Sequence, residues 1–188
     1  IAGLPTWCSL RVSEKNYTSM EEKSDIFIAI NKETVQSDTL KVKSGGFFLY
    51  NANLKLDLEQ VPKDVELVPV DFSSVAGSVN KSIKLKKLLT NMVYVGVLAE
   101  MLGIPNDVIE SSIQFQFKNK ESVVDVNRQA VLAGREHCKN HLKINHPYSL
   151  EKKNGMTDKI LIDGNTSAAI GAVFGGCSFV SWYPITPS

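Results

Sequence analysis

The chain has 188 residues, of which 43% are hydrophobic, and its 21 basic side chains are balanced by 20 acidic ones. This composition favours one or two packed domains and excludes a disordered chain. The net charge of +1 creates no basic field that would attract nucleic acid or an anionic membrane surface. No apolar run approaches the roughly 20 residues that span a bilayer, and no secretory signal pattern is present. We therefore expect a cytoplasmic protein with neither nucleic acid nor a membrane as partner.

Short, continuous apolar runs in the first part of the chain predict strands that are buried on both faces. They cover residues 8–13, 25–31, 46–51 and 65–70. Residues 33–41 fit a short crossover helix between the second and third runs, and a Ser-Gly-Gly turn follows it. Strands that alternate with helices in this way predict an α/β fold with a Rossmann-like, mostly parallel sheet.

Helices are predicted in the middle of the chain. Apolar residues recur at helical spacing over 85–102, and Gly103 ends that run. Asn106 is typical of the start of a second helix, and a third covers 122–138. The segment after it is polar and charged and is punctuated by proline and glycine, which is typical of a linker.

The last part of the chain has the pattern of one βαβ unit. Apolar residues 160–162 predict a strand, residues 163–166 can start a helix, and the small residues 167–174 let that helix pack close to a sheet. A second apolar and aromatic run, 178–182, predicts a strand that Pro184 ends, because proline cannot donate to a sheet ladder. Open α/β sheets bind ligands at the carboxyl ends of their strands. On spacing alone, the proline motif is also typical of a purely structural turn.

Two separate stretches resemble the 2-oxoacid:ferredoxin oxidoreductases. The first, similar to the gamma domain of members in which the gamma and alpha domains are fused, is Gly3-Leu4-Pro5-Thr6-Trp7 with Leu10-Arg11-Val12-Ser13. The second resembles the opening of the pyrimidine-binding domain and consists of Ile162-Asp163-Gly164-Asn165-Thr166-Ser167-Ala168-Ala169-Ile170-Gly171-Ala172 and Trp182-Tyr183-Pro184-Ile185-Thr186-Pro187-Ser188.

The resemblance implies a domain organisation. Residues 1–142 are expected to form a Rossmann-like gamma domain that lacks its N-terminal strand and glycine-rich turn. Residues 143–158 are expected to be a linker, and residues 159–188 the first βαβ unit of a thiamine-diphosphate pyrimidine-binding (alpha) domain. By this interpretation the sequence is an excerpt of a longer alpha subunit.

The resemblance also implies cofactors and partners. The family uses thiamine diphosphate with Mg²⁺, [4Fe–4S] clusters and coenzyme A, and it passes electrons to ferredoxin. The chain has only three cysteines, Cys8, Cys138 and Cys177, which lie far apart and cannot supply the cysteine quartet of a cluster. We therefore expect the cluster to lie on a partner chain. The resemblance implies that this partner is a beta subunit, that it also holds the Mg²⁺ and the diphosphate, and that this chain binds no metal.

The family's Tyr-Pro-Ile-Thr-Pro motif supplies the main candidate site. By resemblance, Thr186 hydrogen-bonds the oxoacid substrate, and a hydroxyl suits that task because it can donate to a carboxylate or keto oxygen. Tyr183, Pro184 and Ile185 are expected to line the same cofactor pocket. The catalytic glutamate of the family lies beyond this motif, so no catalytic residue is expected in the chain.

Three other groups of polar residues can be interpreted either as parts of a ligand site or as structural features. Asn165 and Thr166 are candidates for facing an anion at a helix start, although plain helix capping is the simpler interpretation. The basic cluster Lys81, Lys84, Lys86 and Lys87 can meet a phosphate-rich ligand or be a solvated helix turn. His137, His141 and His146 lack the glutamate of a zincin motif and are interpreted as a solvent-facing helix end.

The resemblance predicts the reaction as well. The intact enzyme is expected to decarboxylate a 2-oxoacid oxidatively to an acyl-CoA and CO₂ while it reduces ferredoxin. The fused gamma–alpha order and the Ile-Asp-Gly-Asn start resemble the 2-oxoglutarate branch more than the large pyruvate enzymes. The alternative is a non-catalytic, Rossmann-like module that docks subunits or binds a ligand.

Overall fold

The structure is a computed structural model that describes residues 5–15, 17, 19–118, 120–142, 144, 148–153, 155 and 157–183. It divides into two compact units, Ile1–Leu150 and Glu151–Ser188. None of the described helices is both long and apolar enough to cross a bilayer.

A parallel three-stranded sheet is the centre of the first unit. Its strands are β1 (Ser24–Ala29), β2 (Val42–Asn51) and β3 (Glu66–Val70), and they lie side by side in chain order. Phe48 of β2 stands opposite Phe27 of β1 and Leu67 of β3. The α/β class and the parallel sheet predicted from the sequence are therefore confirmed.

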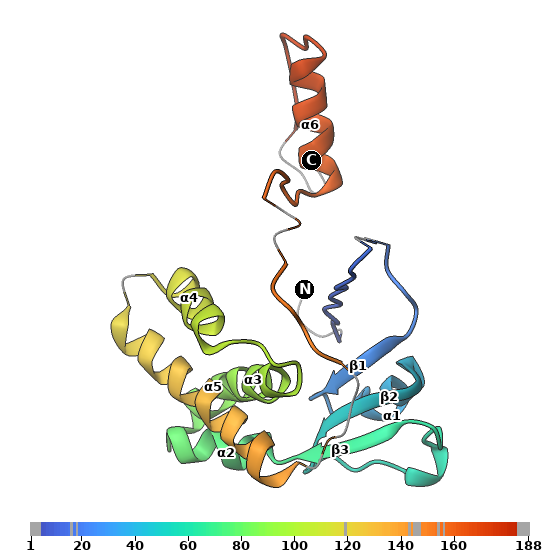
Figure 1. Cartoon of the computed structure of the whole chain (residues 1–188), viewed down its shortest axis with the longest axis vertical. Helices are drawn as coiled ribbons and strands as arrows, with labels where there is room; N and C mark the ends of the chain where they lie inside the picture. The colour runs from blue at the N-terminus through green and yellow to red at the C-terminus, as the bar shows by residue number, and fades with distance from the viewer. Residues whose placement is uncertain are drawn as a thin grey trace. The chain divides into compact units, whose positions relative to one another are not determined.

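Long helices cover one face of the sheet, and a shorter helical segment covers the other face (Figure 1). Because side chains alternate along a strand, Phe47 and Leu49 join the core under the long helices, whereas Phe48 points to the opposite face. The bounds of the helical segments in this unit are α1 (Val35–Asp38) with a 3₁₀ turn (Thr39–Lys41), a second 3₁₀ turn (Leu58–Gln60), α2 (Phe72–Val79), α3 (Ile83–Met101), α4 (Asn106–Gln116) and α5 (Glu121–His141).

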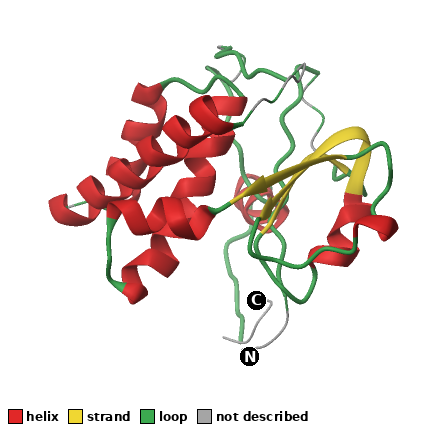
Figure 2. Ribbon diagram, turned by 90° about the horizontal axis from the view of Figure 1, so that it is seen from below, coloured by secondary structure: helices red, strands yellow, loops and turns green. Residues whose placement is uncertain are grey.

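The predicted helices over 85–102, from Asn106 and over 122–138 correspond to α3, α4 and α5. Helix α2 was not predicted, although Asp71 caps it by accepting a hydrogen bond from the Ser74 amide at 2.9 Å. Figure 2 shows the helices gathered beside the strands of this unit. All of α2, α3 and α5 contribute buried side chains to one core with the sheet.

Helices α3 and α5 cross at two glycines. A Cβ atom added to Gly96 would stand under 3.0 Å from the Val131 carbonyl oxygen, and one added to Gly134 would stand as close to the Val93 carbonyl oxygen. Both positions are buried. The two helix backbones therefore touch without intervening side chains, which is how small residues let helices approach closely.

The outer strand β3 contains a proline. Pro69 stands opposite Tyr50 in the register, while the carbonyl of Val70 accepts a hydrogen bond from the Ala52 amide at 2.9 Å. Because hydrogen bonding alternates along a strand, the nitrogen of Pro69 faces the free edge of the sheet.

Two predictions about the N-terminal part are wrong. Residues 8–13 do not form a strand, and Leu10 and Val12 are exposed. A side-chain contact holds this segment instead, since Arg11 pairs with Glu21 at 2.8 Å.

The Ser44-Gly45-Gly46 segment is also not a turn before a strand. It lies inside β2, where the register against β1 shifts and Gly45 has a φ of +73°. The glycines form a bulge, because they tolerate that backbone geometry.

Part of the predicted linker packs against the first unit. Ile144 and Tyr148 lie on the core, the Tyr148 ring meets Phe47 edge-on at 6.2 Å, and the Leu150 amide donates to the Leu102 carbonyl at 2.9 Å. The first unit thus extends to residue 150. The assignment of residues 159–188 to a pyrimidine-binding domain stays a prediction.

The second unit contains helix α6 (Gly164–Phe174), which lies where a small-residue helix was predicted. Gly176, with a φ of +86°, follows its end, in agreement with the predicted glycine stop. The flanking segments 160–162 and 178–182 are not strands in the described structure. A strand forms only in a hydrogen-bonded ladder, and no described segment of this unit offers one.

Candidate functional site

Polar side chains meet at the carboxyl ends of β2 and β3, where parallel sheets present their ligand sites. Asn51 ends β2, Asn53 follows it, and Asp71 follows β3. The Asn53 side chain donates to one carboxylate oxygen of Asp71 at 3.0 Å. That same oxygen accepts from the Ser74 amide. Asp71 thus serves the local structure, as an α2 cap and a link between two strand ends.

His137 of α5 lies within electrostatic range of Asp71. Burial lowers the pKa of His137 below its usual value of 6.5, the neighbouring His141 lowers it further, and Asp71 opposes the shift. The two histidine rings stack with centroids 4.7 Å apart. Of the three histidines singled out in the sequence, these two are brought together, and His146 lies outside the described residues.

The lowered pKa of His137 predicts acid sensitivity. Just below pH 6.5 the unfolded chain binds a proton at this position that the folded chain does not, so stability falls as the pH drops from about 6.5 towards the folded-state pKa. We expect the free energy of unfolding, measured by urea denaturation between about pH 5 and 8, to decrease as the pH is lowered. The His137→Gln variant should show a weaker dependence on pH. An unchanged slope in the variant would contradict the assignment.

The chain's thiols are not grouped. Cys8 and Cys177 are exposed, and Cys138 is buried, which together with the nearby Glu100 raises its pKa to about 11. In the described part of the chain, no three histidine, cysteine or carboxylate side chains cluster closely enough to hold a metal ion.

The start of α6 contains two predicted site residues. Asp163 caps the helix: its carboxylate accepts from the Thr166 amide at 2.9 Å and from the Thr166 hydroxyl at 2.6 Å. These hydrogen bonds lower the pKa of Asp163. Thr166 therefore takes part in the capping of α6 as the donor to Asp163, and Asn165 lies in the same first turn. A role of these two residues towards an anion stays a prediction.

Of the Tyr-Pro-Ile-Thr-Pro motif, the structure describes only the first residue, Tyr183. Tyr183 is exposed, and Pro184, Ile185 and Thr186 lie outside the described residues. The structure therefore does not test the predicted pocket of these four residues.

A buried carboxylate lies near the N-terminal motif, and the sequence analysis did not identify it. Asp38, which is 2% exposed, accepts from the Trp7 indole nitrogen and from the Lys41 ammonium, each at 3.0 Å. The ammonium also lies 3.7 Å from the centre of the Trp7 ring. Trp7 belongs to the first stretch that resembles the gamma domain, and this contact gives it a structural role: it holds the N-terminal segment on α1.

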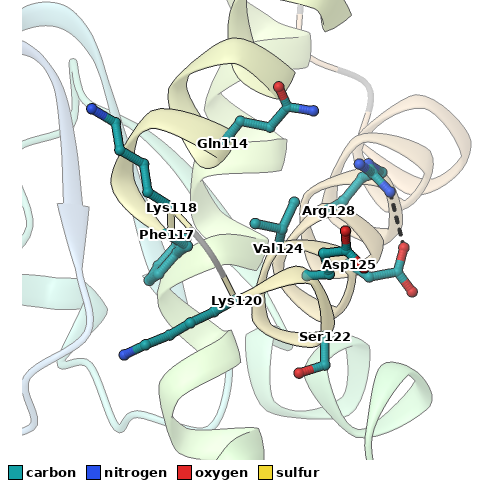
Figure 3. A pocket seen from close by; sticks show the side chains of 9 residues that line it. Gln114, Phe117, Lys118, Lys120, Ser122, Val124, Asp125 and Arg128 are labelled. Carbon is teal, nitrogen blue, oxygen red and sulfur yellow. Dashed lines mark hydrogen bonds and ion pairs between the residues drawn. The ribbon is translucent and has the colours of Figure 1, made fainter.

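A hollow of about 640 Å³ lies between the end of α4 and the start of α5. Figure 3 shows Lys118 and Lys120 extending away from Arg128, which is paired with Asp125. Arg128 also pairs with Glu110. The guanidinium is therefore already neutralised, and the side chains of the described lining residues do not converge as free donors on one point, as an anion site would require.

Comparison with known proteins identifies relatives over the whole chain. Residues 1–137 match the family described as pyruvate ferredoxin/flavodoxin oxidoreductase. The alpha subunit of 2-oxoacid:ferredoxin oxidoreductase 1 from Sulfurisphaera tokodaii is 26% identical over an alignment that covers 100% of this chain and 34% of that protein. The chain thus spans about a third of the length of the curated relatives it matches.

Solved structures are similar as well. The 2-oxoglutarate:ferredoxin oxidoreductase from Magnetococcus marinus, with 2-oxoglutarate, coenzyme A and succinyl-CoA bound, has 29% identity and a TM-score of 0.71 over 87% of this chain and 28% of its own. The gamma subunit of a keto/oxoacid ferredoxin oxidoreductase from Geobacter sulfurreducens has 21% identity and a TM-score of 0.50 over 61% of this chain and 64% of its own. The second likeness concerns the fold alone.

Proposed function

The chain belongs to the pyruvate ferredoxin/flavodoxin oxidoreductase family, and from this membership we propose that it is part of the alpha subunit of a thiamine-diphosphate-dependent 2-oxoacid:ferredoxin oxidoreductase. The observation that carries the proposal is the match of residues 1–137 to the family, together with an alignment of the entire chain to 2-oxoacid:ferredoxin oxidoreductase alpha subunits. The beta subunit of the same enzyme and ferredoxin are the proposed partners, and the cytoplasm is the proposed location.

The proposed reaction converts a 2-oxoacid and coenzyme A to an acyl-CoA and CO₂. The bond between the carboxylate and the keto carbon breaks, and a thioester bond to the coenzyme A sulfur forms. The two electrons released pass singly to two ferredoxins, and one proton is released. Thiamine diphosphate, when bound, supplies the carbanion chemistry. Three cysteines that lie far apart in the sequence cannot supply the cysteine quartet of a [4Fe–4S] cluster, and by resemblance to the family we assign this cluster, the Mg²⁺ and the diphosphate to the beta subunit.

We propose 2-oxoglutarate as the oxoacid. The support is the likeness to the Magnetococcus marinus enzyme, which was solved with 2-oxoglutarate bound. Steady-state rates of the full complex with 2-oxoglutarate and with pyruvate test this assignment. We expect the higher kcat/KM with 2-oxoglutarate, and a clear preference for pyruvate would contradict the substrate while leaving the reaction class in place.

We propose that Thr186 hydrogen-bonds the oxoacid, with Tyr183, Pro184 and Ile185 lining the pocket. A hydrogen bond to a charged group contributes about 1.5–3 kcal/mol, so Thr186→Ala in the full complex should lower kcat/KM by roughly 10- to 100-fold. Thr186→Ser keeps the hydroxyl and should retain most of the activity. The assay is 2-oxoacid-dependent reduction of ferredoxin at saturating coenzyme A. Unchanged turnover and oxoacid affinity in the alanine variant would favour the non-catalytic module.

A further inference from the structure

The chain that follows α5 returns to the first unit at the end of α3. The Leu150 amide donates to the Leu102 carbonyl at 2.9 Å, and the Tyr148 ring meets the Phe47 ring edge-on, with 6.2 Å between their centroids. We call residues 148–150 the strap. The second unit begins directly after the strap. The strap is therefore the point from which the connection to the second unit leaves the first.

A tight turn at the end of α3 presents the carbonyl that the strap binds. Gly103 has a φ of +67°, and the Ile104 amide donates back to the Ala99 carbonyl at 2.9 Å. This is a common glycine-based ending of a helix, and it requires the positive φ. Carbonyls at a helix end lack partners within the helix, so the Leu102 carbonyl can accept the Leu150 amide. The position of this turn therefore decides whether the strap can bind.

Arg135 of α5 holds the same turn. Its guanidinium donates to the Ile104 carbonyl and, at 3.1 Å, to the Glu100 carboxylate. The side chains of Arg135 and Glu100 are only 13% and 23% exposed, so water weakens this charged contact little. A cation is also favourable at the carbonyl end of a helix, which carries a partial negative charge. Without the guanidinium, the turn that presents the Leu102 carbonyl would be held less firmly.

The strap is less firmly bound than the core beneath it. Tyr148 and Leu150 are half-buried and Ser149 is exposed, whereas Leu49 of β2 is fully buried. Segments with few buried contacts open locally at a lower free energy than the one needed to unfold the whole domain. The strap can therefore detach while the sheet and the helices of the first unit stay folded.

We propose that the strap is releasable and that Arg135 is the positioning residue that keeps it closed, because it fixes the turn at the end of α3. In the closed state the connection to the second unit leaves from Leu150. In the open state the free connection extends back towards the end of α5 at His141. Opening thus lengthens the connection and increases the reach of the second unit. This inference goes beyond the proposed reaction and does not depend on it.

The test is amide hydrogen exchange of the intact complex, resolved to single amides by electron-transfer fragmentation. It compares the wild type with Arg135→Ala and with a matched control, Arg128→Ala. Arg128 lies on the same helix but pairs with Glu110 and Asp125, away from the turn that binds the strap. We expect Arg135→Ala to raise the exchange rate of the Leu150 amide by about tenfold or more. The control should change that rate little, and the amides of β2 should exchange slowly in all three proteins.

The fold is expected to tolerate Arg135→Ala, because Lys139 lies 3.7 Å from Glu100 and still pairs with that carboxylate. Unchanged exchange of the Leu150 amide, or an equal acceleration in β2, would overturn the role of Arg135. So would an equal acceleration at Leu150 in the control variant.

A second measurement needs no variant. Exchange of the wild-type complex is followed at several urea concentrations below the unfolding transition. Local opening exposes little surface, so exchange of the Leu150 amide should be nearly independent of urea, whereas exchange in β2 should accelerate as urea is added. An equal urea dependence at the two places would show that the strap opens only with the whole unit, and the releasable strap would be wrong.

Discussion

The Gly134→Ala variant should be destabilised by at least ~2 kcal/mol, because the new methyl group has no space to occupy. Its Cβ would stand under 3.0 Å from the Val93 carbonyl oxygen and 3.2 Å from the Cα of Gly96. Both neighbours are backbone atoms of α3, so no side-chain rotation can relieve the overlap. The helices must move apart, and the buried core that they share with the sheet must open. Urea denaturation followed by circular dichroism measures the loss.

A helical glycine of the same unit provides the control. A Cβ added to Gly77 of α2 would meet only the flexible end of Lys86, with the nearest atom at 3.4 Å. Because alanine is favoured over glycine inside a helix, Gly77→Ala should be neutral or stabilising by up to about 1 kcal/mol. If the two alanine variants had equal stability, the close contact between α3 and α5 would be wrong.

The Phe48→Ala variant should have the second large effect, a loss of about 3–5 kcal/mol. Phe48 is fully buried on the central strand β2, and its ring stacks on Phe27 at 5.8 Å and on Tyr50 at 5.9 Å. The alanine would remove the middle ring of this row and leave a cavity under α1. Since domains have stabilities of about 5–15 kcal/mol, a large part of the total would be lost.

The matched control is Phe115→Ala on α4. Phe115 is 71% exposed, and its ring contacts only the Lys118 ammonium among the ring and cation contacts of the described residues, at 4.2 Å. The same truncation there should change the free energy of unfolding by about 0.5 kcal/mol or less. Equal midpoints of thermal unfolding in the two variants would contradict the placement of Phe48 in the core.

Much of the first unit is predictable from local patterns. The continuous apolar run 46–51 predicts a strand buried on both faces, and β2 indeed contributes Phe47 to one core and Phe48 to the other. The helical spacing over 85–102 predicts a buried helix, and α3 is one. These predictions succeed because period and burial are properties of the segment itself.

Other features depend on contacts between distant segments. Helix α2 has a capping aspartate but is short and rich in serine, and its stability comes from Phe72 and Ala76, which are buried under α3 and α5. The contact of Trp7 with Asp38 joins residues 31 positions apart, and no local pattern signals it. Residues 8–13 have the composition of a strand, yet the structure gives them no hydrogen-bonded partner strand.

The candidate site shows the same division. The cap at Asp163 follows from a local pattern and is present. The proposed role of Thr186 comes from resemblance to a family rather than from any geometry of this chain. A single segment can indicate the chemistry of a proposed pocket, but the arrangement of the pocket depends on residues from other segments, which the sequence of that segment does not reveal.

Pro69 makes the two borders of the sheet unequal. Its ring nitrogen has no hydrogen to offer at the outer edge of β3, so an incoming strand would lose a hydrogen bond there and meet the ring instead. The outer edge of β1 contains no proline. Any further strand is therefore expected to pair with the outer edge of β1. At the outer edge of β3, Pro69 disfavours incorrect strand pairing and aggregation.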